Sequence, residues 1–168
     1  MPDERGIIRT PGTARTIDLG AFGVSVHADG IDTGGAFSLL ETGESVIGAG
    51  PPLHVHRDCA ETFYVLAGSY VMIVADREVL CRTGSVVIVP SGTTHTFKSA
   101  EAGSRKLNLY TPAAMVGYFD ELAAGIAAGM DATDLEAIAG RYAMDVVGEV
   151  PDGYLQRADD RGPGRPPG

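Results

Sequence analysis

The stretch that decides the fold reads Gly48-Ala-Gly-Pro-Pro-Leu-His54-Val-His56-Arg-Asp-Cys-Ala-Glu61, and a second stretch, Gly84-Ser-Val-Val-Ile-Val-Pro90-Ser-Gly92-Thr-Thr-His95, completes it. The first two histidines point to the same side of an extended strand, because side chains alternate along a strand with a period of two. A carboxylate follows five residues later, and the second stretch adds a third imidazole. Three imidazoles and one carboxylate form a ligand set suited to a divalent transition metal.

The two stretches resemble the two sequence motifs of the cupin superfamily. The first motif requires Gly, His-x-His, Glu and Gly at set spacings, and it is matched at Gly48, His54, His56, Glu61 and Gly68. The second motif is matched at Gly84, Pro90, Gly92 and His95, with Ser99 where the family usually has Asn. The resemblance implies an all-β double-stranded β-helix, or jelly-roll, barrel with one metal ion at its centre (Fe, Mn, Ni, Co, Cu or Zn), held by His54, His56, Glu61 and His95.

The rest of the chain predicts a barrel independently, because it contains many short apolar runs separated by turn signals. The expected strands before the first histidines are Thr16–Leu19, Gly23–Ala28 and Ala36–Glu41. The later ones are Glu61–Ala67, Tyr70–Ala75, Glu78–Arg82, Ser85–Val89, Thr94–Lys98 and Arg105–Thr111. After Pro112 the apolar period changes to that of a helix, which predicts helices over Val116–Ala128 and Asp134–Tyr142. Thr133 and Glu136 have the spacing of a capping box for the second helix.

These elements divide the chain into four segments. We expect an N-terminal arm at residues 1–13, a single cupin barrel at 14–112 and a C-terminal helical segment at 113–156. The final segment, 157–168, is polar and rich in Gly and Pro, which is typical of disorder.

Composition excludes several classes of function. The net charge of −9 argues against a broad nucleic-acid surface, and no apolar run approaches the roughly 20 residues that span a membrane. The first residues carry acids and no apolar region of a signal peptide, so a cytoplasmic location is expected. The two cysteines, Cys59 and Cys81, are too few for a disulfide framework. Cys59 is either a thiolate ligand or a small loop residue, and we favour the latter; His27 lies outside both motifs and is assigned a structural or surface role.

The inward faces of the strands predict the residues of a substrate pocket. Counting by twos from Glu61 gives Phe63 and Val65, and counting from His95 gives Phe97. The predicted lining is therefore apolar and partly aromatic, which suits a planar or hydrophobic organic substrate. The same side chains would also serve simply to fill the core of the barrel.

The last strand of the predicted barrel, Arg105–Thr111, leaves two alternatives open. Leu107 and Leu109 share one face, and Asn108 and Tyr110 share the other. The pattern does not decide which face points inward, and Asn108 and Tyr110 are taken as the candidate pocket residues.

The resemblance to quercetin dioxygenases implies a metal-dependent oxygenase acting on a small aromatic or enolisable substrate. In such cupins the glutamate binds the metal and also takes a proton from the substrate, so Glu61 is the candidate catalytic residue; the alternative is that it is a ligand only. A homodimer is expected from the family. Two other functions remain open: a non-oxidative cupin enzyme (isomerase, cyclase or decarboxylase) and a small-molecule-binding cupin.

Overall fold

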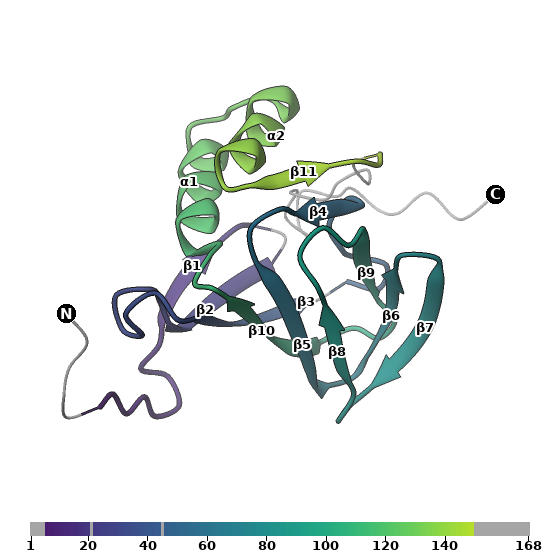
Figure 1. Cartoon of the computed structure of the whole chain (residues 1–168), viewed down its shortest axis with the longest axis horizontal. Helices are drawn as coiled ribbons and strands as arrows, with labels where there is room; N and C mark the ends of the chain where they lie inside the picture. The colour runs from purple at the N-terminus through teal and green to yellow at the C-terminus, as the bar shows by residue number, and fades with distance from the viewer. Residues whose placement is uncertain (1–5, 21, 45, 150–168) are drawn as a thin grey trace.

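The computed structural model describes residues 6–20, 22–44 and 46–149, which form two facing antiparallel sheets and two helices (Figure 1). The larger sheet has the order β1-β2-β3-β10-β5-β8, formed by β1 (Arg15–Asp18), β2 (Phe22–Ala28), β3 (Ser38–Glu44), β10 (Ser104–Thr111), β5 (Ala60–Ala67) and β8 (Val86–Val89). The smaller sheet has the order β11-β4-β9-β6-β7, formed by β11 (Met144–Val146), β4 (His54–His56), β9 (His95–Ser99), β6 (Ser69–Val74) and β7 (Arg77–Arg82). The all-β jelly-roll architecture predicted from the sequence is confirmed.

Two neighbouring strands of the larger sheet, β3 and β10, turn a mostly polar face into the barrel. Alternate residues of each strand are buried, as the period of a strand requires. Leu107 and Leu109 lie on the half-buried opposite face, so the polar phase of β10 is the inward one. The strand expected at Ala36–Glu41 continues to Glu44. The inward residues are Ser38, Leu40, Thr42 and Glu44 on β3, and Ser104, Lys106, Asn108 and Tyr110 on β10.

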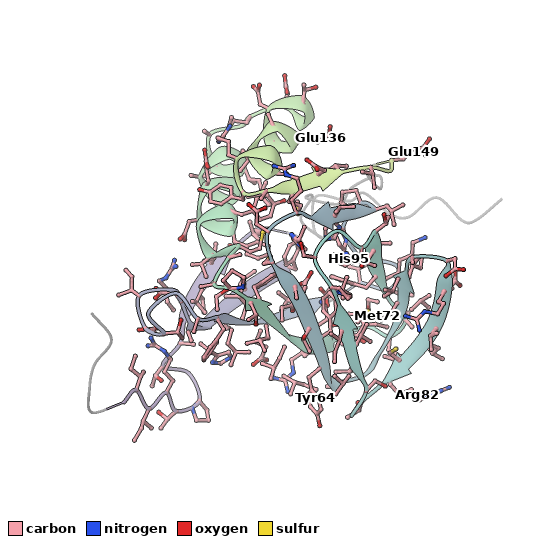
Figure 2. All side chains as sticks on the ribbon, in the orientation of Figure 1. Tyr64, Met72, Arg82, His95, Glu136 and Glu149 are labelled. Atoms are coloured by element: carbon pink, nitrogen blue, oxygen red, sulfur yellow. The ribbon has the colours of Figure 1, made fainter. Side chains whose placement is uncertain are left out.

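The apolar core falls into two clusters. One fills the space between the sheets and includes Phe63, Val65, Tyr70 and Met72. Figure 2 shows Met72 among the side chains between the sheets, whereas Tyr64 and Arg82 lie on the outside. The second cluster joins the strands at the other end of the barrel to the helices, and it includes Leu19, Val24, Leu40, Tyr118, Leu122 and Ile138. The helices are therefore packed on the barrel by burial of apolar area, which is the main source of their stability.

Both predicted helices form, as α1 (Val116–Ala127) and α2 (Ala132–Arg141). The capping box expected at Thr133 is wrong, because α2 begins at Ala132 and its N-cap is Asp131. The Asp131 side chain accepts a hydrogen bond of 2.9 Å from the backbone N–H of Asp134. A cap residue needs an extended backbone, which Asp131 has, and Thr133 lies inside the helix.

A strand that the sequence did not predict, β11, follows α2 and pairs with β4. The register places Met144 opposite His56 and Val146 opposite His54. Figure 1 shows the two helices and β11 together at one end of the barrel, with β11 running alongside β4. Arg57, just after β4, bonds to the Asp145 carboxylate and to the Gly140 carbonyl oxygen. The C-terminal segment is thus tied to the strand that carries the first two histidines.

The segment boundaries predicted at the two ends are only partly covered by the structure. Residues 6–13 of the expected arm contain no helix or strand. The expected tail, 157–168, lies outside the described residues, as do residues 150–156 of the helical segment. No helix in the described part of the chain has the length and apolar character needed to cross a membrane.

Candidate metal centre

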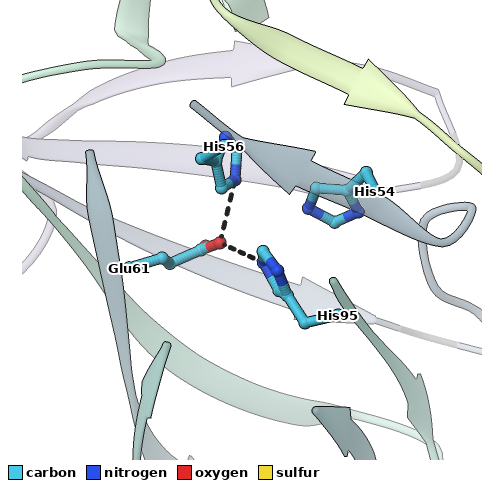
Figure 3. A group of neighbouring side chains, drawn as sticks. All are labelled: His54, His56, Glu61 and His95. Atoms are coloured by element: carbon cyan, nitrogen blue, oxygen red, sulfur yellow. Dashed lines mark hydrogen bonds and ion pairs between the residues drawn. The ribbon is translucent and has the colours of Figure 1, made fainter. Parts of the chain in front are cut away.

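The four predicted ligands come together between the two sheets (Figure 3). His54 and His56 project from the same face of β4, and His95 at the start of β9 pairs directly with His54. Glu61, near the start of β5 in the larger sheet, faces them from the opposite wall. Each of the four residues is 4% exposed or less, so the centre is shielded from bulk water.

The donor atoms are close enough to share one ion. They lie within 4.8 Å of one another. The Oε2 atom of Glu61 is 3.1 Å from Nε2 of His56 and 3.0 Å from Nε2 of His95. Neutral imidazole and carboxylate are the ligands that a borderline divalent metal prefers, and four of them leave positions open for a substrate.

Backbone carbonyl groups orient two of the imidazoles. Nδ1 of His54 lies 2.8 Å from the Pro52 carbonyl oxygen, and Nδ1 of His95 lies 3.0 Å from that of Thr93. A neutral imidazole that donates its Nδ1–H to a carbonyl oxygen has its Nε2 lone pair available to a metal ion, whereas without metal a hydrogen on Nε2 of His95 is donated to Glu61. His56 differs, since its buried Nδ1 has no hydrogen-bond partner among the described residues. The donor set and the two oriented imidazoles therefore fit a metal ion.

Burial and mutual contacts shift the pKa values of these groups. Burial alone would raise the pKa of Glu61, but hydrogen bonds from His56 and His95 outweigh it and hold that pKa well below its ordinary value. Burial, together with the neighbouring His95, lowers the pKa of His54 to about 4. Burial also acts to lower the pKa of His95, but the bond to Glu61 prevails and the pKa is raised. The carboxylate is therefore ionised, and His95 is the imidazole that takes up a proton most readily of these.

Metal uptake is expected to weaken as the pH falls, because protons compete with the metal for imidazole nitrogens. The pKa of His54 is about 4, so this imidazole stays neutral until far into the acid range. The pKa of His95 lies above the ordinary histidine value of 6.5, so this imidazole takes up a proton at a higher pH. The decline in affinity should therefore begin above pH 6.5. Chelator competition from about pH 8 to about pH 5 measures it, and a constant affinity over that range would contradict the assignment.

A cavity with a volume of about 50 Å³ adjoins the centre. Phe97, Asn108 and Tyr110 line it, together with the metal ligands His54, His56 and Glu61. Phe63 and Val65 were expected to line it as well, but they lie in the core cluster between the sheets. They share the inward phase of β5 with Glu61. Phe63 packs edge-on against the His95 ring, with 6.2 Å between ring centroids, but neither side chain is part of the cavity lining.

Several residues of the cavity wall were not predicted. Thr42 and Glu44 line it from the end of β3, beyond Glu41, where the strand was expected to end. The available signal was their spacing of two residues from Leu40, which puts all three side chains on one face of the strand. That face was not recognised as inward because Thr42 and Glu44 are polar. The other side chains are apolar and come mainly from β2 and the C-terminal segment: Phe22, Met115, Tyr118, Phe119 and Met144, with Pro51.

The two residues of undecided role, Cys59 and His27, lie outside the group of ligands. Burial, reinforced by Glu61, raises the pKa of the Cys59 thiol to about 11, so it is a poor thiolate. His27 pairs with Glu41, at 3.2 Å between Nε2 and Oε2, on the partly exposed face of the larger sheet.

Comparisons with known proteins agree with this geometry. The model of the cupin domain family matches residues 40–107. The fold is similar to KdgF from Halomonas sp., with a TM-score of 0.58 and 17% identity over 64% of this chain and 94% of that one. It is also similar to an RmlC-like cupin from Shewanella frigidimarina (TM-score 0.54, 16% identity, 63% and 90% covered). A third similar structure is the polyketide cyclase RemF from Streptomyces resistomycificus (TM-score 0.53, 24% identity, 62% and 79% covered).

No curated protein sequence matches the chain. The structural neighbours, at these identities, are similar in fold alone. Residues 40–107 match the cupin domain family, and the jelly-roll fold with its four buried His and Glu side chains at the motif spacing agrees with that match, so the observations together support assignment to the cupin superfamily.

Proposed function

We propose that this chain is a metal-dependent enzyme that oxygenates a small aromatic or enolisable organic substrate. The observation that carries the proposal is the cluster of four buried candidate ligands, three of which (His54, His56 and Glu61) line a cavity whose other side chains are largely aromatic or methionine. An apolar cavity with a few convergent polar groups is the usual form of a small-molecule site. A divalent transition metal bound by these ligands would supply Lewis acidity and, where redox-active, electron transfer with dioxygen.

Glu61 is the residue that would accept a proton from the substrate. Its low pKa keeps it ionised at neutral pH, as a proton acceptor must be. Because a low pKa also makes a carboxylate a weak base, the bound metal would have to acidify the enol or phenol hydroxyl for the transfer to occur. Asn108 Nδ2 donates to Oε1 of Glu61 at 2.9 Å and holds the carboxylate in place. The buried position excludes water that would compete for the same proton.

The cavity favours a small, uncharged substrate. A volume of about 50 Å³ has room for only about four water-sized molecules at roughly 10–15 Å³ each, so one ring or a short chain is the natural size. Two carboxylates, Glu44 and Glu61, line the cavity, and no Lys or Arg is among the described residues that line it. Phosphorylated substrates are therefore disfavoured, since no basic side chain among these lining residues would pair with their charge and two carboxylates would repel it.

A second candidate is a non-oxidative enzyme such as an isomerase, cyclase or decarboxylase. The observation that favours it is the presence of two carboxylates, Glu44 and Glu61, on the wall of one small cavity. Glu61 can exchange a proton with a substrate, and Glu44 supplies fixed negative charge because its two oxygens accept from Lys106 and Tyr70. This chemistry needs no dioxygen.

Parallel aerobic and anaerobic assays separate the two candidates. Metal-loaded protein is incubated with single-ring catechols and with short-chain enediols while dioxygen uptake and products are followed. We expect uptake matched to product with the unchanged protein, and at least a roughly 100-fold loss of rate with Glu61→Gln, the scale typical of a general base. His27→Ala, which changes a histidine outside the centre, is the control and should keep full activity.

Product formed equally without dioxygen would contradict oxygenation and leave the second candidate. Full activity in Glu61→Gln would show that this residue is a ligand only. No turnover of any such substrate, even with bound metal, would favour a binding protein.

The homodimer stays a prediction. It is supported by an exposed apolar patch on the outer face of the larger sheet, formed by Tyr64 on β5 and by Val86 and Ile88 on β8. Apolar patches of this kind mark contact surfaces in many soluble proteins.

A further inference from the structure

We propose that Lys106 is a positioning residue that, through Thr42 and Asn108, holds the Glu61 carboxylate in the orientation in which one oxygen faces His56 and His95. The inference rests on the proposed metal-dependent function, because Glu61 is one of the four ligands. It concerns a row of buried polar side chains on β3 and β10 that lies outside both cupin motifs. The argument follows the direction of each hydrogen bond, beginning at the lysine.

Lys106 is a fully buried lysine with two close partners. Its Nζ atom lies 2.7 Å from Oγ1 of Thr42 and 2.7 Å from Oε1 of Glu44. Burial lowers the pKa of Lys106 below its ordinary value, and the Glu44 carboxylate limits that shift. The ring of Phe97, whose centre is 3.7 Å from Nζ, and that of Tyr70, at 4.5 Å, also favour the charged form. An ammonium group has donors and no acceptor, so both short contacts are donated by Lys106.

The donor-to-acceptor order of the hydrogen bonds continues from Lys106 through Thr42 and Asn108 to Glu61. Because Thr42 Oγ1 accepts from Lys106, its single hydrogen is free to donate to Oδ1 of Asn108, 3.1 Å away. The carbonyl end of the Asn108 amide is thereby turned toward Thr42, and its Nδ2 group donates to Oε1 of Glu61 at 2.9 Å. The other oxygen, Oε2, then faces Nε2 of His56 and of His95.

The charged groups at the two ends make this order one-directional, because Lys106 can only donate and the Glu61 carboxylate can only accept. A hydroxyl and an amide can each reverse their hydrogen bonds, and a reversed Asn108 would set its Oδ1 against Oε1 of Glu61, two acceptors facing each other. Repulsion between these two oxygens would rotate the Glu61 carboxylate out of its present orientation toward His56 and His95. Glu44 secures the far end of the row, because its second oxygen accepts a hydrogen bond from the Tyr70 hydroxyl. Buried partners of metal ligands commonly act in this way on metal affinity.

The test compares Thr42→Val, which removes the hydroxyl and keeps the shape, with Thr42→Ser, which keeps the hydroxyl. The probe is Co²⁺, with its dissociation constant measured by chelator competition and its visible absorption spectrum recorded for the bound ion. We expect Thr42→Val to bind Co²⁺ about 10-fold more weakly and with an altered spectrum, at the lower end of the effect of such partners. Thr42→Ser should restore both properties, and a purely structural role would not move the spectrum of the bound ion.

A double variant, Lys106→Met with Glu44→Gln, removes the donating end of the row without leaving an unpaired charge, and it should weaken Co²⁺ binding in the same sense. Thermal unfolding without metal shows whether each variant is folded. Wild-type affinity and spectrum in the folded Thr42→Val protein, or in the double variant should Thr42→Val not fold, would overturn the role of Lys106 and leave the metal centre intact. Failure of the unchanged protein to bind Co²⁺ at all would overturn both this inference and the proposed function.

Discussion

Replacing His95 by alanine is expected to weaken metal binding by more than about 100-fold and to remove metal-dependent activity. Removing a residue that only hydrogen-bonds to a metal ligand already lowers metal affinity by about 10–100-fold. His95 supplies one of the four ligands itself, so its loss should cost more. Its Nε2 atom is 3.0 Å from Oε2 of Glu61, and its backbone pairs with His54 across β4 and β9. The loss therefore opens one side of the centre while the strands that hold the other ligands stay in place.

Elemental analysis of the purified protein measures this effect. The unchanged protein should carry near-stoichiometric metal, and His95→Ala should carry little. His27→Ala is the matched control, because it removes a histidine that pairs with Glu41 outside the centre. Stoichiometric metal in His95→Ala, or its equal loss in both variants, would contradict the assignment of the ligands.

Gly50→Ala is expected to destabilise the fold by at least about 3 kcal/mol, which lies at the severe end for single substitutions. Gly50 lies in the loop that leads to β4, and an added Cβ would stand 1.8 Å from the backbone oxygen of Phe97 on β9. The same loop bonds to β9, since the Gly48 N–H donates to the Ser99 carbonyl oxygen and the Ser99 N–H to that of Ala49. Because a backbone atom in a paired strand cannot step aside, the loop or the strand must move.

Thermal unfolding of the protein without metal checks this expectation. For a chain of this length the loss corresponds to a fall in Tm of about 6–12 °C. Gly140→Ala is the control, because a Cβ at this exposed position of α2 meets nothing within 4 Å, and alanine in a helix is favoured over glycine by roughly 0.5–1 kcal/mol. A Tm of Gly50→Ala within about 2 °C of the unchanged protein would show that the loop adapts.

The ligand set could be predicted from the sequence because its determinants are local. His54 and His56 share a strand face by the period of two, and Gly48 and Pro90 are turn residues at fixed distances from the histidines that follow. At these positions the spacing of the residues and their suitability as metal ligands indicated the same site. The strands that carry the ligands were predicted for the same reason.

Only part of the cavity wall could be predicted. Phe97, Asn108 and Tyr110 were candidates and line it, but the inward face of β10 stayed undecided because its more hydrophobic face is the outer one. On β10 the leucines Leu107 and Leu109 lie on the outer face, and Asn108 and Tyr110 point inward. The interior accepts polar groups because they satisfy one another, as Asn108 does with Thr42 and Glu61. Those partners come from distant parts of the chain, and the alternation of polar and apolar residues along one strand does not show which distant residues will pair.

Pairing of β11 with β4 also bears on where this domain can be cut. Without Met144–Val146, the strand that carries His54 and His56 would become the border of its sheet, with its backbone amides open to water. The residues that match the family, 40–107, would then hold every ligand and yet lack the strand that protects two of them. The smallest autonomous fragment able to retain the ion therefore has to extend through Val146, and any transplant of this centre into another scaffold needs an equivalent flanking strand.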